Sequence, residues 1–249
     1  MKKYRAVLFD LFGTVALFNG EKLPLFEWNG QTSRSTLGGL RAVYEQKVPT
    51  VPFASFFTAL TDVSRELGDA RAREKREFSS AHRFTLTLVR AGLPDSPATR
   101  RLAEELSLAH MALLAGATEI PPAHASLLRQ ARERYGTALV SNFDHGPTAR
   151  RILRRGGVED HFQCITISEE HGWRKPHPQI FTDTLSALGA EPGEALFVGD
   201  SSQEDIVGAR GVGMDMAWVN ALNAALPAGI PAPDYTVRAI PELQRILLP

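Results

Sequence analysis

The sequence contains a single cysteine, Cys164, among its 249 residues. One thiol excludes an internal disulfide bond, and because Cys164 lies in an apolar run we expect a small buried residue in a reducing compartment. No run approaches the roughly 18 apolar residues that a membrane-spanning helix needs. The N-terminus shows no signal-peptide pattern. These absences predict a cytoplasmic protein that has no membrane partner.

The chain also lacks an excess of charge of either sign. It has 28 basic and 28 acidic residues, so its formal net charge is zero. A protein whose main partner is nucleic acid or an anionic membrane typically carries a basic surface. The arginine-rich run 65–76 interleaves with acidic residues, which is typical of a solvated helix face. We therefore expect a small-molecule substrate and no nucleic acid, for a monomer or a homodimer.

Short apolar runs recur along the chain without alternating polar residues. Such runs are typical of parallel strands that are covered on both faces. Segments with helical spacing separate the later runs, and this alternation predicts an α/β fold with a doubly wound parallel sheet. The predicted strands are 6–9, 137–140, 164–167, 195–198, 216–219 and 234–237, and the predicted helices between and after them are 123–135, 146–155, 178–188, 205–211 and 240–248.

The interval between the first and second strands is much longer than one crossover requires. More than 120 residues separate Thr14 from Thr137, whereas a crossover needs a single helix. We expect residues 1–17 and 117–249 to form a core domain and residues 18–116 to form an inserted helical domain. Within the insert, the composition predicts a flexible connection over 19–35 and the spacing predicts helices over 37–45, 53–67, 72–91 and 98–115.

Residues able to carry out chemistry follow four of the predicted strands. The carboxyl ends of parallel strands meet at one edge of the sheet, about 5 Å apart, so these side chains are expected to converge. In chain order they are Asp10 with Phe12, Gly13 and Thr14; Ser141 with Asn142; Lys175, in the sequence Lys-Pro-His-Pro; and Asp200 with Asp205, in the sequence Gly-Asp-Ser-Ser-Gln-Glu-Asp.

Each of these residue types has a clear use at a strand end. A carboxylate at Asp10 can attack an electrophilic phosphorus or carbon and divide one difficult step into two. The hydroxyl of Ser141 and the amides after it can hold an anionic group. Lys175 supplies a cation that balances the carboxylates and the developing charge. Gly13 allows a tight turn, and Thr14 can orient the substrate or bind the neighbouring loop.

The four segments, in this order, resemble the motifs of the haloacid dehalogenase-like hydrolase superfamily. The arrangement is similar to the subfamily in which a helical cap follows the first motif. The resemblance implies a Rossmann-like core and a hydrolase in which Asp10 is the nucleophile. It implies that Ser141, Asn142 and Lys175 bind the phosphoryl group of the substrate, and that Thr14 supports the catalytic site.

The resemblance also implies a Mg²⁺ site. In phosphatases of the superfamily the ligands are the nucleophile carboxylate, the backbone carbonyl two residues later and the first Asp of the fourth motif. Here these are Asp10, the carbonyl of Phe12 and Asp200, which are hard oxygen ligands of the kind that Mg²⁺ prefers. Asp205 would orient Lys175 or a metal-bound water from behind the ligands, or cap the following helix. Glu204 is an alternative for the orienting role.

Phe12 departs from the pattern of the superfamily. Its phosphatases have a second Asp at this position, which protonates the leaving group and activates water, a contribution worth ~10²–10⁴ in rate. A phosphatase without it favours substrates whose leaving group needs no proton, or uses another acid. His145, His171 and His177 are near in sequence, although loop histidines of this kind are more often structural.

The departure leaves three functions open. Dehalogenases of the superfamily also lack the second Asp, but they use no metal and have Ser and Asn where this chain has Asp200 and Ser202. An extra carboxylate beside Asp10 would repel an anionic substrate unless a cation is bound. The sequence therefore favours a Mg²⁺-dependent phosphatase over a metal-independent 2-haloacid dehalogenase. A ligand-binding relative with little turnover is the third possibility.

The inserted helical domain resembles the superfamily's cap, which closes over the site and excludes water. Residues of such a cap select the substrate. Arginine and histidine side chains are candidates for that selection, and aromatic side chains in the insert either line an apolar pocket or form its core. The basic candidates are Arg34, Arg41, His82 and Arg83, and the aromatic residues are Trp28, Phe53, Phe56 and Phe57.

Overall fold

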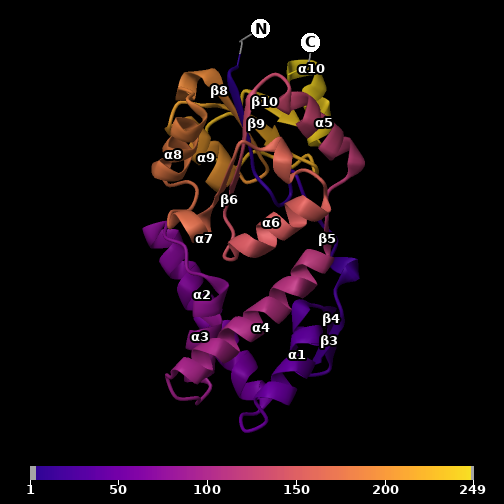
Figure 1. The fold of residues 1–249 in the computed structure, drawn as a ribbon, viewed down its shortest axis with the longest axis vertical. Helices are drawn as coiled ribbons and strands as arrows, with labels where there is room; N and C mark the ends of the chain where they lie inside the picture. Colours follow the sequence, from indigo (N-terminus) through magenta and orange to yellow (C-terminus); the bar gives the residue numbers. More distant parts are fainter. Residues whose placement is uncertain (1–3, 248–249) are drawn as a thin grey trace. The chain divides into compact units, whose positions relative to one another are not determined.

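A computed structural model describes residues 4–247 and divides the chain into two compact units (Figure 1). The core unit comprises the residues up to Phe18 and those from Glu119 onward, and the helical unit comprises Asn19–Thr118. The ends of the predicted core range, 1–3 and 248–249, and the last residue of the predicted helix 240–248 lie outside the described part of the chain.

A six-stranded parallel sheet forms the middle of the core unit, with the strand order β10-β9-β8-β1-β6-β7. Its chain direction reverses at β1, so the carboxyl end of β1 lies at the switch point where ligands bind in doubly wound folds. The predicted α/β fold with a doubly wound sheet is confirmed. The strands are β1 (Ala6–Phe9), β6 (Gly136–Ser141), β7 (Cys164–Ile167), β8 (Ala195–Gly199), β9 (Asp215–Val219) and β10 (Tyr235–Val237).

Helices cover both faces of this sheet (Figure 1). Ile180 and Phe181 of α8 and Ala209 of α9 pack with apolar residues of β1, β6, β8 and β9 on one face. The α-helices of the core unit are α5 (Pro122–Arg132), α6 (Gly146–Arg155), α7 (Ser168–His171), α8 (Pro178–Leu188), α9 (Val207–Gly211) and α10 (Gln244–Leu247).

Two predicted helices of the core unit are less regular than expected. The predicted helix 205–211 begins with a π-helical turn over Ser202–Ile206, which continues into α9. The predicted helix 240–248 consists of a 3₁₀ turn, Ile240–Leu243, and α10. Cys164 is half-buried rather than buried.

Four helices form the second unit around a core rich in aromatic residues. Serine side chains cap the first turns of three of them, where backbone amides lack helical partners. The predicted helix 72–91 was wrong over its first residues, because the preceding helix continues to Glu74 and ends at Lys75, which has a φ of 55°. The helices are α1 (Thr36–Lys47), α2 (Phe53–Glu74), α3 (Ser80–Arg90) and α4 (Pro97–Gly116).

The segment 19–35, predicted to be a flexible connection, contains regular structure instead. Strands β3 (Leu25–Trp28) and β4 (Gln31–Arg34) pair as an antiparallel hairpin. Asn29 and Gly30 connect them with φ angles of 48° and 76°, values that match the Asn-Gly preference of a tight type I′ turn. Two further short strands, β2 (Leu17–Phe18) and β5 (Thr118–Glu119), form a separate two-stranded sheet.

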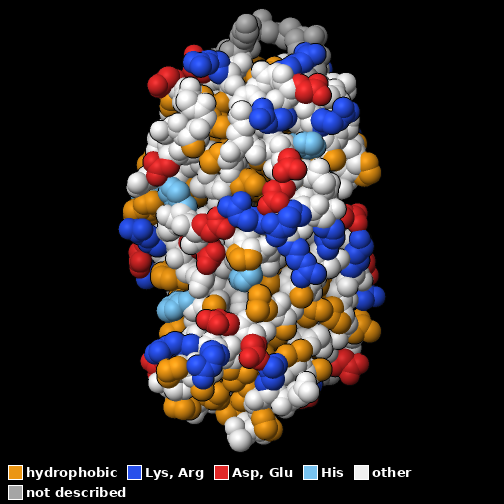
Figure 2. All heavy atoms as spheres, viewed as in Figure 1, with side chains coloured by type: hydrophobic (Ala, Val, Ile, Leu, Met, Phe, Trp, Pro, Cys, Tyr) orange, Lys and Arg blue, Asp and Glu red, His pale blue; other side chains and the backbone are white. Residues whose placement is uncertain are grey.

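The surface carries mixed charges. Figure 2 shows basic and acidic side chains interspersed on the face drawn there, in agreement with the equal numbers of the two in the sequence. Among residues 4–247, no helix combines the length and apolar composition that crossing a lipid bilayer requires.

Candidate active site

The register of the central strands brings Asp10, Ser141 and Asp200 to the same edge of the sheet. Phe9 of β1 lies opposite Leu139 of β6 and Val198 of β8. Asp10 directly follows β1, Ser141 ends β6 and Asp200 directly follows β8. Since all three strands are parallel, their carboxyl ends place these polar residues side by side.

Lys175 lies at the centre of the site between two carboxylates. Its Nζ lies 2.6 Å from Oδ1 of Asp10 and 2.7 Å from Oδ1 of Asp205. The lysine side chain is only 1% exposed, and its ammonium group also lies 5.2 Å from the ring centroid of Phe197. Burial by itself would lower the pKa of Lys175, but the two carboxylates hold it above its usual range. Lys175 is therefore a permanent cation.

Three carboxylates surround this single cation. Ligand oxygens of Asp10, Asp200 and Asp205 all lie within 4.8 Å of one another. Burial raises the pKa of Asp10 to about 7, against the opposing effect of Lys175. Desolvation and then the neighbouring Asp205 carboxylate raise the pKa of Asp200 to about 6, although Asp200 is exposed to solvent. One lysine does not neutralise three carboxylates, and a divalent cation fits both the charge and the oxygen donors.

Two glycines make room for the acidic cluster. Gly13 has a φ of +77°, and a Cβ at this position would overlap the Asp200 carboxylate. A Cβ at Gly199 would overlap the Asp205 carboxylate. Side chains at these two positions would displace the acids, so the glycines fix where the carboxylates lie.

We predict that Gly13→Ala weakens divalent-cation binding by ~10-fold or more, because the methyl group displaces Asp200. The positive φ should also cost about 1–2 kcal/mol of the free energy of unfolding. Gly30→Ala is a matched control, since Gly30 has a φ of +76° and nothing within 4 Å of its Cβ position. Calorimetric Mg²⁺ titration and denaturant unfolding separate the two effects. Equal Mg²⁺ affinity in both variants would contradict the steric argument.

The hydroxyl groups of Thr14 and Ser141 have no protein partner. Thr14 is fully buried and Ser141 is 1% exposed, yet neither side-chain oxygen makes a hydrogen bond within the described residues. Buried polar groups normally have partners, so an orphaned pair at a strand edge indicates a missing ligand. Both hydroxyls belong to the segments predicted to hold the substrate.

Asn142 has a different position from the one predicted. Its side-chain amide donates to the Lys175 carbonyl oxygen at 2.9 Å, and its Oδ1 accepts from the Lys175 amide at 2.8 Å. Both polar groups of the side chain are therefore engaged by the Lys175 backbone. The structure gives the Asn142 side chain a role in holding Lys175 instead of direct contact with a phosphoryl group.

Asp205 serves the loop as well as the lysine. Its Oδ2 accepts a hydrogen bond from the Ser201 amide at 2.9 Å, while Oδ1 faces Lys175. Glu204, the alternative for this position, instead lies 3.4 Å from Arg174. Only Asp205 of these two acids reaches the lysine.

Three positioning contacts have no signal in the sequence. The His124 ring nitrogen Nδ1 lies 3.0 Å from the Val15 carbonyl oxygen and holds the turn after β1. The indole of Trp218 donates to the Asp200 carbonyl oxygen at 2.9 Å. Ser168 accepts from the Phe143 amide at 2.9 Å and donates to the carbonyl oxygen of the same residue at 3.2 Å.

The histidines considered as substitute acids have structural partners. His145 Nδ1 accepts from the Thr148 amide and caps α6. His171 Nε2 lies 3.0 Å from Asp183. His177 Nδ1 accepts from the Gln179 amide at the start of α8. These contacts favour the interpretation of all three as loop histidines.

The candidate selective residues of the helical unit also have local contacts. Arg34 pairs with Glu21 at 3.0 Å, Arg41 pairs with Glu45 at 2.8 Å, and Arg83 lies 3.4 Å from Ser80. His82 is exposed. Of the aromatic residues, Phe53 and Phe56 are buried in the core of this unit, and Trp28 and Phe57 pack against it.

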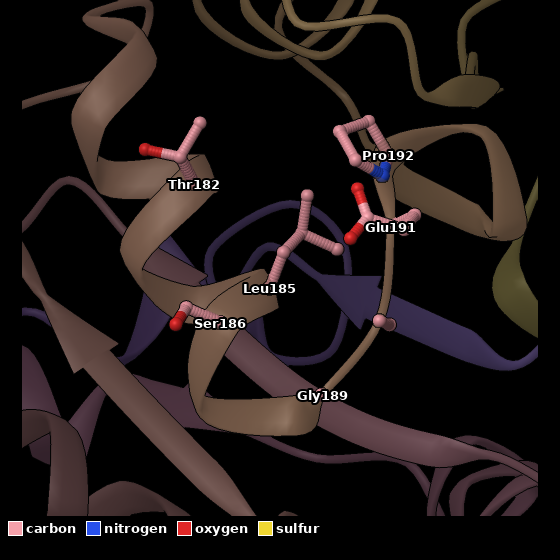
Figure 3. Close-up of a pocket in the computed structure, with 7 residues that line it drawn as sticks. Thr182, Leu185, Ser186, Gly189, Glu191 and Pro192 are labelled. Atoms are coloured by element: carbon pink, nitrogen blue, oxygen red, sulfur yellow. The ribbon is translucent and has the colours of Figure 1, made fainter.

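A depression of about 470 Å³ at the end of α8 lies apart from these residues (Figure 3). Thr182, Leu185, Ser186, Glu191 and Pro192 line it. It contains none of the strand-end residues, and its one carboxylate, Glu191, belongs to the capping box of the following turn. Chemistry is therefore assigned to the edge of the sheet.

Comparison with known proteins agrees with this geometry. Residues 4–213 match the family described as haloacid dehalogenase-like hydrolase. The chain is 35% identical to the glyceraldehyde 3-phosphate phosphatase of Pyrococcus furiosus over 131 residues, which cover 52% of this chain and 54% of that protein. It is 36% identical over 129 residues to a pyrimidine 5'-nucleotidase of Escherichia coli, covering 51% and 56%. The chain spans about half the length of these curated relatives.

A solved structure shows the same fold. The 2-haloacid dehalogenase from Pseudomonas syringae pv. Tomato DC3000 superposes with a TM-score of 0.76, covering 99% of this chain and 98% of that chain. The two sequences are 22% identical, so this similarity concerns the fold alone.

Proposed function

The chain belongs to the haloacid dehalogenase-like hydrolase family, and we propose that it is a metal-dependent phosphatase acting on a small phosphorylated molecule. The observation that carries the proposal is the group of Asp10, Asp200 and Asp205 around Lys175. A site for an anionic substrate with three carboxylates and one lysine needs a further cation. The phosphate-ester substrates named for two relatives support the same conclusion.

Asp10 is the proposed nucleophile. A carboxylate oxygen of Asp10 attacks phosphorus, the bond from phosphorus to the leaving oxygen breaks, and an aspartyl phosphate forms. Lys175 balances charge on the transferring phosphoryl group, and the unpartnered hydroxyl of Ser141 donates to its oxygens. Water then attacks phosphorus, which releases phosphate and restores the Asp10 carboxylate. Thr14 and Asp205 support the site.

Mg²⁺ is the proposed cofactor. The carboxylates of Asp10 and Asp200 and the carbonyl of Phe12 would hold it, with Asp205 behind them, and its charge would neutralise phosphoryl oxygens. A side chain other than Asp at position 12 leaves that carbonyl available. We also propose that residues 18–116 act as a cap over residues 1–17 and 117–249, excluding water during the reaction.

The metal should control how stability depends on pH. Because the folded-state pKa values of Asp10 and Asp200 are raised to about 7 and about 6, the chelated folded protein binds more protons than the unfolded chain. Its free energy of unfolding should therefore fall as pH rises from about 4 to 7. Mg²⁺ should reverse that loss, adding roughly 2.7 kcal/mol at a hundredfold excess over Kd.

Thermal unfolding with Mg²⁺ and with a chelator measures this effect. Asp200→Asn should lose most of the Mg²⁺-induced rise in Tm. Glu204→Gln, which alters a carboxylate paired with Arg174, should retain the rise. A wild-type Tm that does not respond to Mg²⁺ at pH 7 would refute the metal site.

One observation favours a second function. The aromatic residue at position 12 is compatible with metal-independent 2-haloacid dehalogenation, because a halide leaves without a proton. In that reaction a carboxylate oxygen of Asp10 displaces halide from carbon and forms an ester. Halide release that a chelator does not diminish would establish this function and exclude the phosphatase. A ligand-binding protein is indicated if neither phosphate esters nor haloacids are turned over.

A further inference from the structure

We propose that the aromatic pair Phe12 and Phe143 restricts this site to phosphoryl groups carried on weakly basic leaving groups, phenolates or carboxylates. The inference rests on the proposed phosphatase function and adds the class of its substrate. Alkyl phosphates, whose alkoxide must gain a proton to depart, would be poor substrates.

The pair occupies equivalent places on two neighbouring strands. Phe12 comes two residues after Asp10 at the end of β1, and Phe143 comes two residues after Ser141 at the end of β6. Because β1 and β6 are adjacent and parallel, the two rings lie next to the nucleophile and the phosphoryl-binding hydroxyl. Their centroids are 4.8 Å apart and their planes meet at 60°, an edge-to-face contact.

Hydrogen bonds of the backbone fix both rings. The amide and the carbonyl of Phe143 are both bound by the Ser168 hydroxyl, and Phe143 is only 8% exposed. The turn that carries Phe12 is closed by the Gly13 amide donating to the Ala16 carbonyl at 2.9 Å, and by the Ala16 amide donating to the Leu11 carbonyl at 2.7 Å. The pair is therefore a built wall of the core unit, and neither ring can donate a proton.

The remaining groups of the core site are poor proton donors. Lys175 is bound by two carboxylates, which hold its pKa above the usual range. The hydroxyls of Ser141 and Thr14 retain their protons at neutral pH. When Asp10 attacks phosphorus, the leaving oxygen keeps the electron pair of the broken bond. A phenolate or a carboxylate departs in this form, whereas an alkoxide does not.

Phenyl phosphate and benzyl phosphate test this inference as a matched pair, because both carry one ring and only the benzyl ester leaves as an alkoxide. Wild type should hydrolyse phenyl phosphate and acetyl phosphate, with a kcat/KM for benzyl phosphate ~10²-fold or more below that for phenyl phosphate. Phe12→Asp should raise the benzyl-to-phenyl ratio by ~10²–10⁴ and add an acid-dependent limb to the pH profile for benzyl phosphate. Phe12→Asn, which is polar but not acidic, should not.

Two results would overturn the inference alone. One is a wild-type enzyme that turns over benzyl and phenyl phosphates at similar rates. The other is a Phe12→Asn variant that raises the ratio as much as Phe12→Asp. If none of the three substrates yields Mg²⁺-dependent phosphate release in any variant, both the proposed function and the inference fail.

Discussion

Replacing Asp10 by asparagine should reduce kcat for aryl phosphates by on the order of 10⁴-fold or more, the scale of loss when a catalytic nucleophile is removed. Asparagine has nearly the same shape as aspartate but cannot form the aspartyl phosphate. Lys175 retains its contact with Asp205, so the variant should remain folded. Steady-state phosphate release and thermal unfolding measure the two properties.

A matched control separates the loss of the nucleophile from a general change of charge. Asp183→Asn alters an aspartate of α8 that pairs with His171, away from the strand ends, and should leave kcat within about twofold. Asp10→Asn activity within tenfold of wild type would show that another group attacks the substrate.

Replacing Lys175 by methionine should produce the largest loss of stability, about 3–5 kcal/mol, because it leaves the Asp10 and Asp205 carboxylates buried without their cation. A domain of this kind has roughly 5–15 kcal/mol of stability in total, so a third or more of it depends on this group. Activity should disappear as well, since no cation would remain to balance the transferring phosphoryl group. Denaturant unfolding at pH 8 with chelator present gives the free energy of unfolding.

Two further variants keep this prediction testable even if Lys175→Met does not fold. Arg174→Met removes the neighbouring cation, which pairs with a partly exposed Glu204, and should cost less than about 1 kcal/mol. Adding Asp205→Asn to Lys175→Met removes one unpaired charge, so the double variant should regain stability but not activity. A loss for Lys175→Met no larger than for Arg174→Met would show that the lysine does not hold the carboxylates together.

The sequence predicts the parts of the fold that depend on local patterns. Continuous apolar runs identify the strands of the core because a strand covered on both faces needs apolar residues at every position. The polar residues after those runs identify the site, since parallel strands end at a common edge. Asp10, Ser141 and Asp200 could be placed together on this argument alone.

Contacts between distant segments could not be predicted in this way. Nothing in the sequence indicates that the Asn142 amide binds the Lys175 backbone, because any of several polar groups could satisfy it. The approach of Asp200 to Gly13 and of His124 to Val15 likewise depends on tertiary packing. The hairpin at Asn29 did have a local signal, an Asn-Gly pair between two strand-like runs, which the polar composition of the segment obscured.

The central claim is that Asp10 forms a covalent phosphoryl intermediate in a Mg²⁺-dependent reaction. Mass spectrometry of protein quenched in acid during turnover of 4-nitrophenyl phosphate tests it most directly. We predict a phosphoryl adduct on the peptide that contains Asp10, absent when Mg²⁺ is chelated and absent in Asp10→Asn. Phosphate release without an adduct on that peptide, together with activity that persists in Asp10→Asn, would contradict the account.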